Sequence, residues 1–353
     1  MFRILLFLSM YIVLFSCSDD PTANVTGEWL IPKNQVFDGG PGKDGIPALT
    51  NPQFITIAEA DFITDNDLVV IFKNANDIRI YAHRILDWHE IINDDVSGNK
   101  ITVSYCPLTG STIGLSRVFT KADSSLKETT FGVSGLLFNS NLILYDRYTD
   151  SYWSQMLNQC VAGELKGTKP NNITLLETTS KTARTMFPEA KVVSNATGVY
   201  GKSQYQSYPY GDYRSNNSYL IFPIQNDDSR LPRKERVLGV KMNGKNKAYR
   251  FADFTDQFIL TDFVGGESII VIGNSQKNYM IAFKSQLTNG KTVSFVEFES
   301  TGDKIFKDTF GNIYNIFGEV IDGSDIGEHL KPTYSYISFW FAWAAFNPET
   351  EIY

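Results

Sequence analysis

A diverged internal repeat is the feature of the sequence that most restricts its fold. The segment Arg79–Val103 aligns with Lys247–Val271 without a gap, and a common order of residues continues beyond both segments. Copies of roughly a hundred residues are too long for solenoid repeats and fit two homologous domains. We therefore predict an internal duplication. The identical pairs on which this prediction depends are Tyr81/Tyr249, Asp94/Asp262, Val96/Val264, Gly98/Gly266, Ile101/Ile269, Val103/Val271, Gly163/Gly323, Gly167/Gly327 and Pro188/Pro348.

Short runs of β-branched and aromatic residues, bounded by Asn, Asp, Gly and Ser, predict strands in both copies. One helix is predicted over Ile85–Asn93, where acidic residues are interspersed among apolar ones. Asp146–Gln155 and Tyr334–Phe346 fit either packed loops or short helices. The sequence thus predicts an α+β fold that is mostly β, with two homologous β-rich domains. The predicted strands span 68–72, 78–82, 101–105, 112–119, 129–138 and 142–145, then 237–242, 248–251, 268–272, 280–283 and 293–298.

The first twenty residues predict export and a lipid anchor. Arg3 precedes an apolar run over 4–15 that is too short to span a bilayer as a stable helix. The run ends in a sequence that resembles a bacterial lipobox, so residues 1–16 are predicted as a lipoprotein signal peptide and Cys17 as the lipidated residue. An ordinary signal peptide with a chance Cys is the alternative. We expect a protein of the cell envelope, held at the outer membrane by this lipid, and residues 18–20 resemble the acidic export tag of surface lipoproteins.

The rest of the chain is predicted to follow the repeat. Residues 17–37 form a tether, 38–195 the first copy with the candidate site, 196–235 a linker, and 236–353 the second, diverged copy. The chain has 32 Lys and Arg residues against 39 Asp and Glu, a formal net charge of −7. Because this balance is acidic and no long basic run occurs, nucleic acid is not an expected partner.

Cysteine and histidine are scarce, so a metal or thiol site must come from few residues. His89 and Glu90 lie on the predicted helix and Cys106 closes a predicted strand, while the second copy has Asn274 at the position of Cys106. A Cys near a His can act as a nucleophile, or the pair can bind Cu or Zn. The alternative is a buried thiol and a hydrogen-bonded imidazole. Cys106 and Cys160 could form a disulfide, leave one thiol reactive, or both be buried.

Further polar and aromatic residues are candidates for ligand binding. Asp146 and Arg147 could form a structural ion pair, or the guanidinium could recognise an anion. Trp153 and Gln155 follow closely in the sequence. His83 would be either a third metal ligand or a strand residue that faces solvent. Two aromatic clusters, over 205–213 and 334–343, could stack on sugars or pack between the copies.

Eight segments of the sequence carry a family resemblance: Asp44–Pro47, Asn51–Phe54, Tyr81–Asp94, Tyr105–Ser111, Phe131–Asn139, Tyr145–Gln155, Arg230–Glu235 and Phe339–Thr350. At these segments the sequence resembles the bacterial family called domain of unknown function 3179. Members commonly resemble secreted proteins or lipoproteins, and no established activity comes with the family. The resemblance favours His89, Glu90 and Cys106 as the residues that carry the site, whereas Thr109 stands where the family pattern often has a second Cys, which argues against a dithiol.

Two functions are therefore predicted. The first is an envelope lipoprotein with a metal- or thiol-dependent site of Cys106, His89 and Glu90 in the first copy, with Cu or Zn as the metal. The second is a non-catalytic surface lipoprotein that binds a glycan or a protein through its aromatic residues. A hydrolase is not predicted, because no nucleophile elbow or other hydrolase motif occurs.

Overall fold

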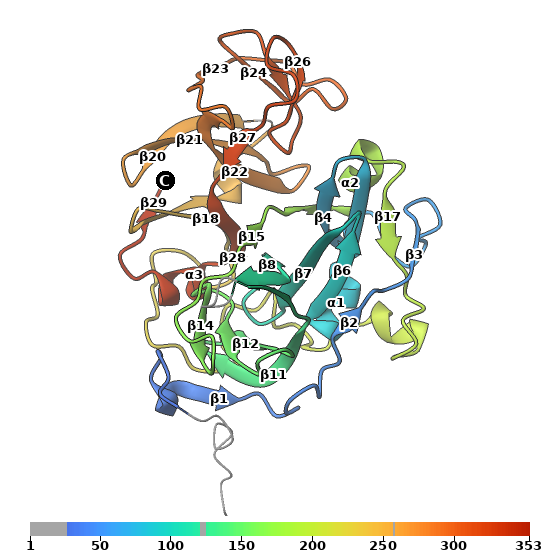
Figure 1. Ribbon diagram of the computed structural model, residues 1–353, viewed down its shortest axis with the longest axis vertical. Helices are drawn as coiled ribbons and strands as arrows, with labels where there is room; N and C mark the ends of the chain where they lie inside the picture. Colours follow the sequence, from blue (N-terminus) through green and yellow to red (C-terminus); the bar gives the residue numbers. More distant parts are fainter. Residues whose placement is uncertain (1–26, 121–124, 257) are drawn as a thin grey trace, which may run out of the picture.

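The computed structural model describes residues 27–120, 125–256 and 258–353, and within them two groups of sheets with the same connections follow each other (Figure 1). Each group begins with a hairpin. A later strand pairs antiparallel with the first strand of the hairpin. A helix then leads to one more strand, which pairs parallel with the second strand of the hairpin. These elements are β4 (Leu68–Asn74), β5 (Asp77–Ala82), β16 (Leu176–Thr179), α2 (Ser180–Met186) and β17 (Lys191–Val193), and then β18 (Arg236–Met242), β19 (Lys245–Arg250), β28 (Tyr334–Phe339), α3 (Trp340–Phe346) and β29 (Glu351–Ile352).

A three-stranded antiparallel meander with a short strand added at its end follows each hairpin, and in the first group β2 (Leu49–Thr50) also pairs parallel with the first strand of the meander. In both groups the added strand pairs antiparallel with the third strand of the meander. The first meander is reached through the helix α1 (His83–His89) and the second through the 3-10 turn η3 (Phe251–Asp253). The strands are β6 (Ile91–Val96), β7 (Asn99–Cys106), β8 (Ser111–Ser116) and β15 (Asn172–Ile173), and then β20 (Phe258–Val264), β21 (Glu267–Asn274), β22 (Tyr279–Leu287) and β27 (Leu330–Pro332).

A four-stranded meander then completes each group. The first is extended by β1 (Val36–Asp38), which pairs with β11. The strands are β11 (Phe131–Phe138), β12 (Asn141–Asp146), β13 (Tyr152–Ser154) and β14 (Gln159–Ala162), and then β23 (Phe295–Val296), β24 (Phe306–Asp308), β25 (Ile313–Tyr314) and β26 (Val320–Asp322). The remaining elements are η1 (Lys33–Gln35), β2 (Leu49–Thr50), β3 (Phe54–Thr56), β9 (Val118–Thr120), β10 (Leu126–Glu128) and η2 (Lys202–Gln206).

The predicted fold class, mostly β, is confirmed, and the repeated order of connections matches what a duplication would produce. One interaction recurs as well. Tyr81 Oη donates to Asp94 Oδ2 at 2.8 Å, and Tyr249 Oη donates to Asp262 Oδ2 at the same distance. Common descent of the two groups stays a prediction.

The hydrophobic core is shared between the two groups of sheets. The largest cluster joins residues of β4 and β7, such as Val70 and Val103, with Ile270 of β21 and Phe306 of β24. A second cluster places α3, which follows β28, against the first four-stranded meander, beside β14 in Figure 1. Trp343 of α3 is fully buried there. Burial of apolar side chains therefore couples the groups to each other.

The predicted helix over 85–93 is wrong in its last part. Glu90 takes a left-handed backbone angle, φ 55°, and its N–H bonds to the carbonyl of Leu86, which ends α1. The chain continues into β6, where the Asn93 side chain donates to the carbonyl of Phe131 and accepts from its N–H, both at 2.9 Å. This contact between two strands outweighs the local preference for a helix.

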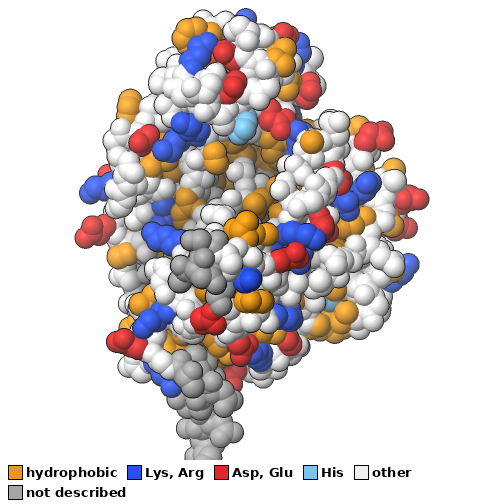
Figure 2. Space-filling view, viewed as in Figure 1, with side chains coloured by type: hydrophobic (Ala, Val, Ile, Leu, Met, Phe, Trp, Pro, Cys, Tyr) orange, Lys and Arg blue, Asp and Glu red, His pale blue; other side chains and the backbone are white. Residues whose placement is uncertain are grey.

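The predictions for the first 26 residues, including the signal peptide and Cys17, lie outside the described residues. Within the described part of the chain, no helix has the length and apolar character needed to cross a membrane. Figure 2 shows positive and negative side chains interspersed over one face, with a hollow below the lobe that carries β23–β26.

Candidate functional site

Because α1 ends in a turn at Glu90, the side chains of His89 and Glu90 point in different directions. His89 is fully buried, with Nδ1 at 2.6 Å from the carbonyl oxygen of Pro47 and Nε2 at 2.7 Å from Tyr205 Oη. A carbonyl can only accept, so Nδ1 carries the proton and Nε2 accepts from the tyrosine. Burial lowers the pKa of His89, which keeps this ring neutral. Its lone pair is thus already in a hydrogen bond.

Glu90 faces a cavity of about 260 Å³. The cavity lies between the segment that contains β1, the turn after β7, and the hairpin of β11 and β12. Its lining is mostly apolar, and Glu90 and the hydroxyl of Tyr210 supply its polar side-chain atoms. The apolar side chains that shape it include Ile46, Leu108, Val133, Leu137, Leu142 and Phe222.

Burial controls the protonation of Glu90. The residue is 6% exposed, and burial, helped by the negative charge of Asp87, raises its pKa to about 8 against the opposing hydrogen bond from Tyr210. At neutral pH the carboxyl group is therefore mainly protonated and can donate a hydrogen bond. This residue is the one member of the predicted trio that lines the cavity.

Cys106 lies close to Glu90 but does not line the cavity. It ends β7, is 1% exposed, and its Sγ lies 3.8 Å from the carbonyl oxygen of Ser140. Burial first, and then the nearby Glu90 charge, raises the pKa of Cys106 to about 11, so its thiol is neutral at pH 7. Cys160 is also buried, and both thiols are free, which answers the question left open by the sequence: neither takes part in a disulfide.

We expect both thiols to resist modification in the native protein. In a chain that begins at Ser18, Cys106 and Cys160 should not react with 5,5′-dithiobis(2-nitrobenzoic acid) at pH 7, because the reactive species is an accessible thiolate. Both should react at once in denaturant. Rapid release of one equivalent of chromophore from the native protein would show instead that Cys106 or Cys160 is a reactive thiol.

The four residues predicted for binding have partners within the protein. Asp146 is fully buried and accepts from the N–H of Thr149 at 2.7 Å and from Trp153 Nε1 at 2.9 Å. Arg147, the first residue after β12, forms its salt bridge with Asp44, at 2.6 Å, and also donates to the carbonyl of Phe131 at 2.8 Å. This bridge holds the segment around Asp44, next to the cavity wall, against β11 and β12.

Gln155 is the centre of a buried polar network. Its Oε1 accepts from Ser111 Oγ and from Asn141 Nδ2, both at 2.7 Å, and its Nε2 donates to Ser104 Oγ at 3.0 Å. Every polar group of this side chain is satisfied. Such a network specifies how the β7–β8 and β11–β12 hairpins pack.

Within residues 27–120, 125–256 and 258–353, no three His, Cys, Asp or Glu side chains converge as a metal-binding group. The Cu or Zn site of Cys106 and His89 stays a prediction. The aromatic clusters are largely packed inside the protein, since Tyr205, Tyr213, Trp340 and Trp343 are fully buried.

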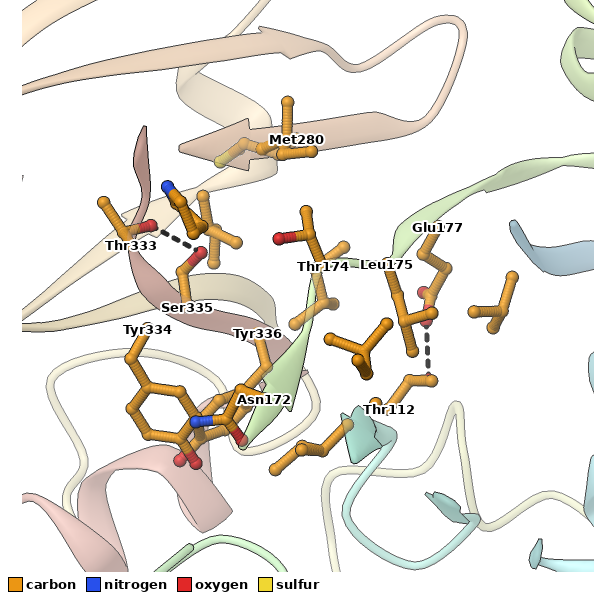
Figure 3. Close-up of a pocket in the computed structure, with 18 residues that line it drawn as sticks. Thr112, Asn172, Thr174, Leu175, Glu177, Met280, Thr333, Tyr334, Ser335 and Tyr336 are labelled. Carbon is orange, nitrogen blue, oxygen red and sulfur yellow. Dashed lines mark hydrogen bonds between the residues drawn. The ribbon is translucent and has the colours of Figure 1, made fainter. Parts of the chain in front are cut away.

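A separate cavity of about 230 Å³ lies where the two groups of sheets meet (Figure 3). Thr112 and Glu177 lie on one side of it, and Met280, Thr333 and Ser335 on the other. Its one charged side chain, Glu177, is bonded to Thr112 and paired with His83 and Arg236. We therefore regard this cavity as part of the junction between the groups and the Glu90 cavity as the candidate site.

The prediction for His83 as a solvent-facing strand residue is wrong. It is the first residue of α1, is 4% exposed, and lies against Tyr105 with ring centroids 4.4 Å apart. Sequence reasoning also missed Asp87 and Glu177, both buried. The spacing of His83 and Asp87, four residues apart, could have placed them on one helical face.

Comparison with known proteins adds one finding. A family model described as "Protein of unknown function (DUF3179)" matches residues 43–350. No curated protein and no solved structure matches the chain.

Proposed function

Because the chain belongs to the DUF3179 family, whose description assigns no activity, we infer its function from the candidate site and propose that the Glu90 cavity binds a small apolar molecule carrying one hydrogen-bond acceptor. The observation that carries the proposal is a buried, mainly protonated carboxyl group in the wall of an otherwise apolar cavity.

The size and lining of the cavity favour an uncharged ligand. Apolar cavities of about 150 Å³ bind benzene, so the 260 Å³ here suffices for a ring with a short substituent. A carboxylic acid that stays neutral at pH 7 donates a hydrogen bond to a carbonyl oxygen, as protonated acids do in other active sites. A charged ligand would lose its hydration without gaining a counterion.

The proposal also covers where binding takes place. The predicted signal peptide over 1–16 and the lipidated Cys17 would hold the protein at the outer membrane of the cell envelope. A small apolar molecule dissolved in or released from the membrane would reach the cavity there. Binding alone is proposed, since the neutral thiol of Cys106 supplies no nucleophile at pH 7.

Acetophenone and isopropylbenzene test the proposal, because they differ chiefly in one carbonyl oxygen. We expect wild-type protein to bind acetophenone about threefold to tenfold more tightly at pH 6.5, the value of one net hydrogen bond. The preference should disappear above pH 9, where Glu90 ionises, and in Glu90→Leu. Titration calorimetry or ligand-observed NMR would give both affinities.

Two variants control the experiment. Glu90→Gln keeps a donor and should keep the preference, while Leu142→Trp should fill the cavity and abolish binding of both compounds. Circular dichroism would confirm that each variant is folded. Equal affinity of wild type for the two compounds, or no binding of either, would overturn the proposal.

A further inference from the structure

A larger cavity, of about 460 Å³, opens beside α1. Its wall combines α1, the residues before β4, the segment after η2, and Asn278 from the turn between β21 and β22. Unlike the Glu90 cavity it is lined almost entirely by polar side chains. The charged and polar side chains in its wall include Asp67, His83, Arg84, Asp87, Arg214 and Asn278.

Two of these side chains are buried without hydrogen-bond partners. His83 and Asp87 are 4% and 5% exposed. Among the described residues, neither His83 Nδ1 nor Asp87 Oδ1 has a hydrogen-bond partner. His83 Nε2 also lacks a hydrogen bond to any described residue, although it lies 3.3 Å from Glu177 Oε2, and Asp87 Oδ2 lies 3.5 Å from Arg214 Nη2. Unpaired buried polar atoms are unfavourable, and a polar molecule bound in the cavity would supply the missing partners.

The charges in this wall are balanced. Arg84 pairs with Asp67 at 2.6 Å, and Arg214 faces Asp87, whose pKa burial raises to about 6 so that it is mainly ionised at neutral pH. An anionic ligand would have to displace a carboxylate from a guanidinium. A cationic ligand would have to displace a guanidinium from a carboxylate. A neutral ligand with many hydroxyl groups requires neither, because each hydroxyl both donates and accepts.

We propose that this cavity binds a small polyhydroxylated molecule of about the size of a monosaccharide. One hydroxyl donates to Asp87 Oδ1, and a second bonds to His83 Nδ1. The guanidinium of Arg214, which lies 3.6 Å from the centre of the Tyr208 ring, donates to a hydroxyl oxygen. Asn278, which belongs to the second group of sheets, also lines this cavity. Its Oδ1 already accepts from Arg236, so its side-chain NH₂ is the group that can donate to the ligand.

Saturation-transfer NMR followed by titration calorimetry tests this site with named probes: glucose, galactose, mannose, N-acetylglucosamine and glycerol, with inorganic phosphate as the charged comparison. We expect at least one sugar, and glycerol more weakly, to bind with millimolar or better affinity. Asp87→Asn and Arg214→Ala should each weaken sugar binding at least tenfold. Arg214 is 44% exposed at its side chain, so its removal should leave no cavity in the core, and circular dichroism would confirm that the variant is folded.

Matched controls separate this site from the rest of the protein. Asp61→Asn alters an exposed carboxylate and should leave binding unchanged, as should Glu90→Gln in the other cavity. The proposal is overturned if no sugar and no glycerol binds, if phosphate binds in preference, or if Arg214→Ala binds sugar as wild type does.

Discussion

Glu177→Gln is expected to lower the free energy of unfolding by about 3–5 kcal/mol, the usual effect of removing one partner from a buried ion pair. Glu177 is 5% exposed and lies within the strand β16. Its carboxylate contacts His83 Nε2 at 3.3 Å and pairs with Arg236 Nη2. Thr112 Oγ1 donates to it at 3.0 Å from the same side of the cavity in Figure 3.

These contacts make Glu177 a buried polar link between the two groups of sheets. Arg236 is the first residue of β18, whereas His83 and Thr112 belong to the first group. A neutral Gln would leave the guanidinium of Arg236, partly buried, without its counterion. Because the apolar core is continuous across the junction, this local loss should appear as global destabilisation in one cooperative unfolding transition.

The pKa of Glu177 predicts how the effect depends on pH. Burial alone would raise this pKa, but the positive charges of His83 and Arg236 lower it to about 2. A carboxylate with a depressed pKa stabilises the fold above its ordinary value of 4.5, and this contribution is lost as the pH falls toward 2. Wild type should therefore lose stability between about pH 4.5 and 2, and Glu177→Gln should lose less over that interval.

Urea denaturation at pH 7 and pH 3 measures both effects. Glu189→Gln, the same substitution at an exposed position, serves as the control and should change stability by less than about 0.5 kcal/mol. A loss below 1 kcal/mol at pH 7 for Glu177→Gln would show that the contacts of this carboxylate do not hold the junction together.

The repeat made much of the fold predictable, because the residues that it repeats bond to each other. Tyr81 and Asp94 recur as Tyr249 and Asp262, and each pair forms the same hydrogen bond between a hairpin strand and the first strand of the next meander. Short apolar runs likewise marked the central strands, whose burial demands such residues. Edge strands such as β20 were missed because most of their side chains are exposed or half-buried and carry a weaker pattern.

The candidate site could be predicted only in part. Glu90 and Cys106 were identified as neighbours in a site, and they do lie close together. The direction of His89 was not predictable, since it depends on the left-handed turn at Glu90, and that turn is set by contacts of β6 with a strand about forty residues later in the chain. The cavity beside α1 was missed because its members come from four separate segments, which short-range patterns cannot relate.

Glu90→Gln is expected to raise the free energy of unfolding by about 2–4 kcal/mol at pH 8, the opposite effect from Glu177→Gln. This value follows from the shifted pKa of Glu90, since one pKa unit corresponds to about 1.36 kcal/mol. Burial raises the pKa of Glu90 from 4.5 to about 8. The folded protein therefore keeps this proton between pH 4.5 and 8 while the unfolded chain releases it, so stability falls as the pH rises through that interval.

Glutamine removes the titration while keeping the shape of the side chain and a partner for the Tyr210 hydroxyl. The free energies of unfolding of Glu90→Gln and wild type should thus differ by less than about 1 kcal/mol at pH 5, and this difference should grow steadily up to pH 8. Denaturation at four pH values between 5 and 8 measures it, with Glu177→Gln as a matched substitution of opposite sign. A constant difference across this range would mean that Glu90 is ionised in the folded protein, and it would remove the hydrogen-bond donor on which ligand binding in the apolar cavity depends.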